Sequence, residues 1–248
     1  MAIAVKNSEG SSATIDIELA QMAAHVERQL ALAIEAFARR DISAAEGIIA
    51  ADERIDRQQQ TIEEKLVIEM AASRLTPARA REIAMQLKMV GKLERVGDLA
   101  KNVAKRTLVV SLEDFAQRTA GGVASMGRTA LRQFSTVLNA YTSSDAVAAK
   151  AVWSGDDDLD ELYNSVFGEI MSEMMLHPSK MNVGAHLLFI AKNFERVGDH
   201  ATSIAEALHY ALTGVQLTTK RPKGDETPTT VFVHPQGDDS GFADQTKK

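Results

Sequence analysis

Acidic side chains spaced four residues apart are the groups in this sequence whose chemistry is easiest to state. Each half of the chain holds two such pairs. The first acidic group is Asp52, Asp56, Glu94 and Asp98, and the second is Asp156, Asp160, Glu195 and Asp199. Residues four apart share one face of an α-helix, so each pair points two carboxylates the same way. Four carboxylates between two helices predict a site for a hard cation that prefers oxygen ligands, such as magnesium, calcium, manganese or iron.

A single pair of this kind has a simpler interpretation, because acids four residues apart most often lie on a solvated helix face. Their recurrence at matching positions in both halves favours the metal hypothesis. Gly97 and Gly198, inside the motifs, are expected to keep space open beside the acids. Arg95 and Arg196 are predicted to orient the acids or contact a partner, or else to be simple salt-bridge partners.

Other reactive groups are few. The chain has no cysteine, which excludes disulfides, thiolate metal sites and thiol catalysis. Glu206 and His209 have the spacing found in di-iron carboxylate sites, but Lys105 and Leu108 hold the matching places in the first half, so we interpret the match as chance. His200 could add a nitrogen ligand beside Asp199. No glycine-rich phosphate loop or local signature of nucleophilic catalysis is present.

Helices must position these acids, because apolar residues recur at spacings of three and four over most of the chain. Six helical stretches are predicted, at about 16–39, 41–73, 76–107, 111–141, 144–176 and 182–212. Asp41 is predicted to cap the second stretch, and Thr76 followed by Pro77 is a strong start for the third. Gly214 is expected to end the last.

An internal repeat organises these helices. Glu94-Arg95-Val96-Gly97-Asp98 recurs letter for letter from Glu195 to Asp199, 101 residues later, and Asp52 and Asp56 recur 104 residues later as Asp156 and Asp160. The repeat predicts an all-α fold of two pseudo-repeated three-helix bundles packed side by side. We assign residues 16–110 and 111–214 to the two bundles, with flexible segments at 1–15 and 215–248.

Composition narrows the class of protein further. With 248 residues, 45% of them hydrophobic, and a net charge of −6, the chain is expected to be globular. Its acidic balance argues against nucleic acid as a direct partner, since no basic face is apparent. Neither a secretion signal nor a long apolar run is recognisable, so we expect a cytoplasmic protein.

The duplicated Glu-Arg-Val-Gly-Asp motif, extended by Leu99-Ala100-Lys101-Asn102 in its first copy and by the segment from His200 to Glu206 in its second, resembles the PhoU family of bacterial phosphate-signalling regulators. The Asp-x-x-Ile/Leu-Asp pattern from Asp52 to Asp56 and from Asp156 to Asp160 is similar to that family as well. Ser203 is a departure, because the family usually has Asn there, as at Asn102.

This resemblance implies two three-helix bundles whose acidic patches bind metal ions, with iron, manganese or magnesium as candidates. It also implies a non-enzymatic negative regulator of phosphate uptake and of the phosphate-starvation (Pho) response. Such a protein links the ATPase subunit of the phosphate ABC transporter to a sensor histidine kinase, forms a homodimer, and reaches the inner membrane through these partners. The positions predicted to orient the acids or contact a partner are Arg95, Asn102, Arg196 and Ser203.

Two alternatives remain open from the sequence. One is a carboxylate-metal helical-bundle enzyme, an oxidase or a hydrolase, although nothing beyond the acids supplies a general base. The other is a purely structural helical adaptor.

Overall fold

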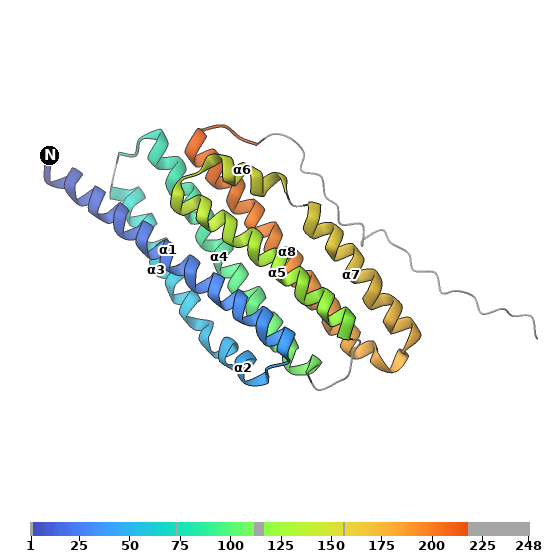
Figure 1. Cartoon of the computed structure of the whole chain (residues 1–248). Helices are drawn as coiled ribbons and strands as arrows, with labels where there is room; N and C mark the ends of the chain where they lie inside the picture. The colour runs from blue at the N-terminus through green and yellow to red at the C-terminus, as the bar shows by residue number, and fades with distance from the viewer. Residues whose placement is uncertain (1, 73, 112–116, 156, 218–248) are drawn as a thin grey trace, which may run out of the picture.

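The computed structural model describes residues 2–72, 74–111, 117–155 and 157–217, and the regular structure in this part of the chain is entirely helical (Figure 1). The α-helices are α1 (Ala2–Arg39), α2 (Ile42–Ala51), α3 (Glu53–Ala72), α4 (Pro77–Val110), α5 (Gln117–Ser143), α6 (Ala146–Ser154), α7 (Asp157–Leu176) and α8 (Met181–Thr213). A 3₁₀ turn, Pro178–Lys180, joins α7 to α8. The all-α prediction is confirmed.

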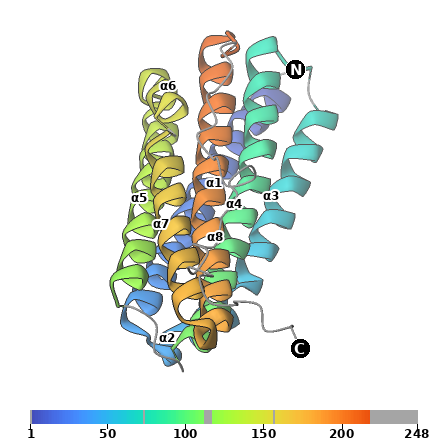
Figure 2. The ribbon, with the colours of Figure 1, turned by 90° about the vertical axis from the view of Figure 1, so that its right-hand side faces the viewer.

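The long helices run alongside one another in two bundles. In the first bundle α1, α3 and α4 pack together, and in the second α5, α7 and α8 do so. The bundles meet where α4 packs against α8 and α1 packs against α5, and Figure 2 shows α4 and α8 side by side in the middle of the molecule. The short helices α2 and α6 lie against α4 and α8, respectively. This arrangement matches the two predicted three-helix units.

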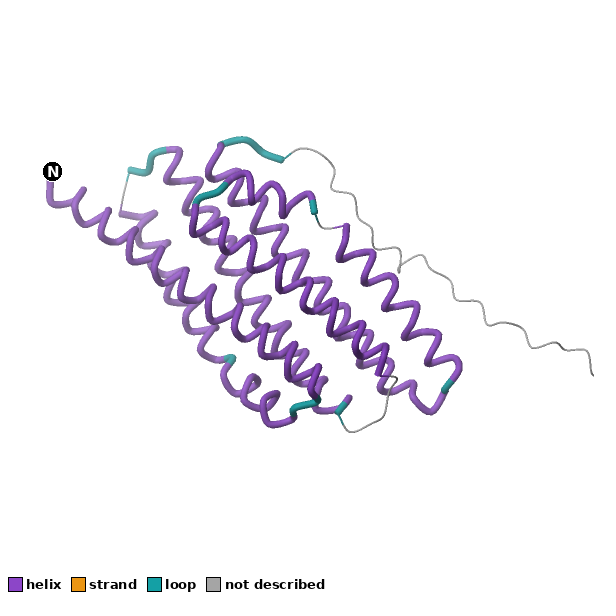
Figure 3. The backbone as a smooth tube through the Cα atoms, viewed as in Figure 1, coloured by secondary structure: helices purple, strands orange, loops and turns teal. Residues whose placement is uncertain are grey.

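Two predicted helices are each broken into a short and a long piece, as the tube in Figure 3 makes visible. The stretch predicted at 41–73 divides at Asp52 into α2 and α3, and the stretch predicted at 144–176 divides near Gly155 into α6 and α7. Periodicity did not reveal these breaks because apolar side chains recur at helical spacing on both sides of each. The first break places Asp52 at the junction of α2 and α3, where it can face α4.

Several predicted helix ends are found where the sequence places them. The Asp41 carboxylate accepts a hydrogen bond from the Ala44 amide (2.9 Å), and the Thr76 hydroxyl accepts one from the Arg79 amide (3.2 Å). Gly214 ends α8 in the left-handed conformation, at φ 72°. These contacts satisfy amide groups at helix starts that have no partner within the helix.

Other predicted boundaries differ or cannot be compared. Helix α1 begins at Ala2, well before the predicted start at residue 16. The predicted start of the fourth stretch falls largely on residues 112–116, and most of the predicted tail falls on 218–248; both lie outside the described residues. Within the described ranges, every helix is too short or too polar to span a lipid bilayer.

Candidate functional site

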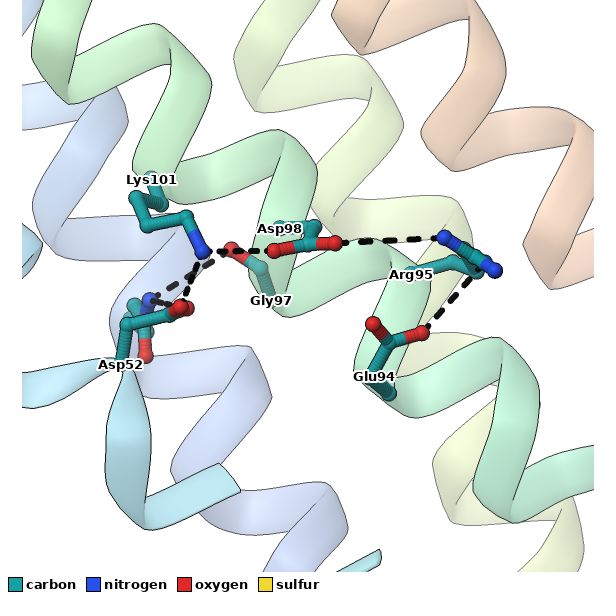
Figure 4. A network of polar contacts seen from close by, with 7 residues as sticks. Asp52, Glu94, Arg95, Gly97, Asp98 and Lys101 are labelled. Carbon is teal, nitrogen blue, oxygen red and sulfur yellow. Dashed lines mark hydrogen bonds and ion pairs between the residues drawn. The ribbon is translucent and has the colours of Figure 1, made fainter. Parts of the chain in front are cut away.

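Three members of the first acidic group form a row of alternating charges with Lys101 and Arg95, beside and along α4 (Figure 4). The Lys101 ammonium donates to the Asp52 carboxylate on one side and to Asp98 Oδ1, 2.7 Å away, on the other. The Arg95 guanidinium continues the row, with Nη1 4.0 Å from Asp98 Oδ2 and Nε 3.4 Å from Glu94 Oε2. Three carboxylates are thus separated by two cations.

Asp52 is the most deeply buried member of this row, with 8% of its side chain exposed. Gln29, on α1, donates from Nε2 to Asp52 Oδ1 (3.3 Å) and to the backbone oxygen of Gly97 (3.4 Å). A buried carboxylate is costly unless it is both charge-paired and hydrogen-bonded. Lys101 and Gln29 meet both needs, and in doing so they connect α1, the junction of α2 and α3, and α4.

The titration behaviour of the row follows from burial and from these contacts. Burial opposes the charge on Asp98, but the hydrogen bond and charge of Lys101 outweigh it and lower the pKa of Asp98 below its usual value. Burial likewise opposes the charge on Lys101, yet its two carboxylate partners raise the pKa of Lys101. For Glu94, burial and then the neighbouring charge of Asp98 raise the pKa. The Lys101 contacts therefore stabilise the ionised form of Asp98.

Gly97 does not keep space open beside the acids, so that prediction is wrong. A Cβ atom at this position would lie 3.0 Å from Cδ1 of Ile55, which is fully buried against α4. The missing side chain serves the close packing of α3 on α4. The space that a side chain at position 97 would take is occupied by Ile55.

Asp56, the remaining member of the first group, lies half-buried on α3, and its charge also raises the pKa of Glu94. Within the described part of the chain, no three His, Asp or Glu side chains converge so that they could hold a metal ion. In the first group, the Lys101 ammonium lies between Asp52 of the α2–α3 junction and Asp98 of α4 and occupies the place between these two carboxylates.

The second acidic group is differently arranged. Asp160 on α7 and Glu195 on α8 are both buried. Glu195 Oε1 lies 3.1 Å from the ammonium of Lys192, one turn earlier on α8, and that ammonium also lies 4.8 Å from the centre of the Tyr163 ring. Asp156, the fourth predicted ligand of the second acidic group, lies outside the described residues.

Asp199 faces an open hollow of about 430 Å³, which it lines together with residues from α4, α6 and α8. His200, Ser203, Lys92 and Trp153 also line this hollow. Burial, and then the nearby positive charges of Lys92 and other cations, lower the pKa of His200 to about 4. The imidazole is therefore neutral at pH 7, the form in which histidine binds metals.

The predicted contact residues lie mostly on the surface. Arg95 has 62% of its side chain exposed, and Arg196 and Asn102 are exposed as well. Glu206 and His209 face different partners, since Glu206 Oε2 is 3.3 Å from Nζ of Lys88 and His209 Nδ1 is 3.2 Å from the oxygen of Val215. Their spacing does not bring them to a shared site in the described chain.

Three residues that contact the acidic groups were not identified from the sequence: Gln29, Lys101 and Lys192. Gln29 could have been found, because Gln133 stands 104 residues later, at the same offset as the matched aspartates. Lys101 follows Asp98 by three residues, a spacing at which helix side chains meet. Nothing in the sequence indicated that Lys192 would reach Glu195 and Tyr163 together.

Comparison with known protein families places both repeats in one family. A model described as the PhoU domain matches residues 19–107 and 123–208. The two matched segments correspond to the two bundles, so the internal repeat inferred from the sequence is a repeat of this domain.

Curated relatives match over most of their length. A protein of Caulobacter vibrioides named "Phosphate-specific transport system accessory protein PhoU homolog" is 41% identical over 221 residues, covering 89% of this chain and 96% of that protein. The Escherichia coli K12 protein named "Phosphate-specific transport system accessory protein PhoU" is 27% identical, covering 81% of this chain and 83% of that protein.

Solved structures show the same architecture. The crystal structure of PhoU from Pseudomonas aeruginosa matches with a TM-score of 0.81 and 27% identity, covering 84% of this chain and 99% of that one. A phosphate transport system regulatory protein PhoU from Streptococcus pneumoniae matches in fold with a TM-score of 0.76. Because the domain model covers most of the chain and a relative above 30% identity spans nearly its whole length, the chain belongs to the PhoU family.

Proposed function

We propose that this chain is a negative regulator of phosphate uptake and of the phosphate-starvation response, and that it links the ATPase subunit of the phosphate ABC transporter to a sensor histidine kinase. The observation that carries the proposal is the match of both bundles to the PhoU domain, together with relatives named as accessory proteins of the phosphate-specific transport system. In this role the protein acts on the cytoplasmic side of the inner membrane through its partners, as a homodimer.

Exposed cations at the two motifs support a contact role. Arg95 and Arg196 stand at matching places in the repeats, and α4 and α8, which carry them, pack side by side. Exposed arginines are well suited to carboxylates of a partner, because the guanidinium donates in a planar fork. Pull-down of the transporter ATPase subunit and of the kinase with the tagged chain tests this, and Arg95→Ala with Arg196→Ala should weaken capture.

The proposal includes a metal ion at the second acidic group. The candidate donors are the buried carboxylates Asp160 and Glu195, and Asp199 and the neutral His200, which line the hollow between α4, α6 and α8. These side chains do not converge in the described chain, so a bound ion would have to draw them together. Oxygen donors suit magnesium, and a mixed oxygen and imidazole set suits manganese or iron. A bound cation there would hold α7 against α8.

Metal binding is tested on chelator-treated protein to which Mn²⁺ is returned. Bound manganese should be detected by elemental analysis, and at a hundredfold excess over the dissociation constant it should stabilise the fold by about 2.7 kcal/mol. Asp160→Asn with Asp199→Asn should abolish both effects. Asp158→Asn, an exposed acid on α7, is the control. Absence of bound metal in the wild type would remove this part of the proposal.

The double variant Glu94→Ala, Glu195→Ala separates the competing functions. Altered starvation signalling with loss of bound metal supports the metal-binding regulator. Loss of a catalytic turnover would favour a carboxylate-metal oxidase or hydrolase instead. Unchanged signalling and unchanged partner capture would favour a purely structural adaptor.

A further inference from the structure

The first acidic group already contains a cation. Lys101 comes from α4, and its ammonium lies between Asp52 of the α2–α3 junction and Asp98 of α4. A bridging metal ion would need these same carboxylate oxygens. The lysine thus stands where a cation joining α3 to α4 would bind.

Burial makes this contact more than a surface ion pair. The side chains of Asp52 and Lys101 are 8% and 22% exposed, whereas typical exposed pairs contribute little to stability. Gln29 fills a further hydrogen-bonding position of Asp52. With these partners Asp52 is charge-balanced by groups belonging to the chain itself, and a metal ion entering the group would have to displace a buried ammonium.

At the position that corresponds to Lys101, the second half has a different residue. The residue 101 positions after Lys101 is Thr202, whose hydroxyl donates to the backbone oxygen of Gly198 at 3.0 Å. That hydroxyl is neutral and cannot balance a carboxylate. The lysine of the second group, Lys192, stands before its motif and pairs with Glu195, which corresponds to Glu94 rather than to Asp98.

We propose that Lys101 is the built-in cation of the first acidic group and that it excludes metal ions from this group. The two repeats then differ in chemistry although they share a fold. The comparison with the second group rests on the proposed function, but the role of Lys101 is measurable in metal-free protein.

Replacing the lysine by its counterpart provides the test. Lys101→Thr should lower the melting midpoint of chelator-treated full-length protein by roughly 5–10 °C, because it leaves Asp52 buried without its cation. Added Mn²⁺ should recover most of this loss, and elemental analysis should show one more manganese per chain than in wild type. Lys105→Thr, at an exposed lysine further along α4, is the matched control.

A second variant keeps the test decisive if Lys101→Thr folds poorly. Lys101→Thr with Asp52→Asn removes both charges, so it should melt above the single variant and should not take up the additional manganese. The proposal is overturned if Lys101→Thr melts like the Lys105→Thr control. It is overturned as well if Lys101→Thr loses stability without gaining manganese, or if the double variant is no more stable than the Lys101→Thr single variant. It is also overturned if Asp52→Asn alone reduces the manganese bound by otherwise wild-type protein. Failure of the wild type to bind any metal would contradict the second-group site alone.

Discussion

Single residues around the first motif hold neighbouring helices together through hydrogen bonds. Gln29 reaches from α1 to both Asp52 and the backbone of Gly97, and it is itself 8% exposed. Because one amide donates to two buried acceptors, removing Gln29 should destabilise the protein more than removing a surface glutamine.

Gln29→Leu is expected to destabilise the protein by about 1–3 kcal/mol, since Asp52 loses a donor and the Gly97 carbonyl loses its contact with Gln29. Urea unfolding followed by circular dichroism measures the change. Gln60→Leu, at an exposed position of α3, should alter stability far less. Equal effects of the two substitutions would show that the Gln29 hydrogen bonds carry no special weight.

Two glycines of α4 are expected to respond to substitution with opposite signs. Gly97→Val should cost about 1–3 kcal/mol, because its β-carbon would stand 3.0 Å from Ile55 and its methyl groups would crowd further. A Cβ at Gly91 would have no neighbour within 4 Å, so Gly91→Ala should stabilise the helix by about 0.5–1 kcal/mol. Thermal melting of both variants checks the opposite signs. A stabilising Gly97→Val would refute the packing role.

At the scale of elements, a polar contact joins the two bundles. Gln86, buried on α4, donates to Asp16 Oδ1 of α1 at 2.6 Å, and the Tyr141 hydroxyl of α5 lies 3.5 Å from the same oxygen. Burial, and then the charge of Glu82, raise the pKa of Asp16 above 3.8. The folded protein therefore holds the Asp16 proton more readily than the unfolded chain does.

A raised pKa in the folded state means that the ionised carboxylate opposes folding at neutral pH. This penalty disappears as the pH falls through the folded pKa toward 3.8, so the carboxyl adds relative stability on acidification. Asp16→Asn keeps an oxygen acceptor for Gln86 and should be more stable than wild type at pH 7, with the difference shrinking toward pH 4. Denaturant midpoints across this range test it, with Asp158→Asn as control. A difference that grows on acidification would contradict the sign.

The helices could be predicted from the sequence because apolar periodicity and helix caps are local signals. The repeat could be predicted because the duplicated motif is visible when the sequence is compared with itself. Thr76, Asp41 and Gly214 mark helix ends through their own backbone chemistry. The breaks at Asp52 and Gly155 were not accessible, since the apolar pattern continues across them. Only part of the site could be predicted. The spacing in the sequence indicated which acids share a helix face, but whether Lys101 or a metal ion balances their charge depends on how α3 approaches α4.

At the scale of the whole molecule, two related bundles pack along α4 and α8, and their acidic groups have become unequal. Lys101 pairs with Asp52 and Asp98 in one bundle, whereas Thr202 bonds to its own helix in the other. Duplication explains the shared fold, because packing positions are retained. The charged positions are free to diverge as long as each buried carboxylate keeps a partner.

For the whole molecule, the central proposal is that this protein represses the phosphate-starvation response. The most direct measurement is the expression of phosphate-starvation genes in cells grown in high phosphate, after deletion of the gene that encodes this chain. High expression is expected in the deletion strain, with repression restored when the wild-type chain is supplied. Continued repression in the deletion strain, with phosphate uptake unchanged, would contradict it.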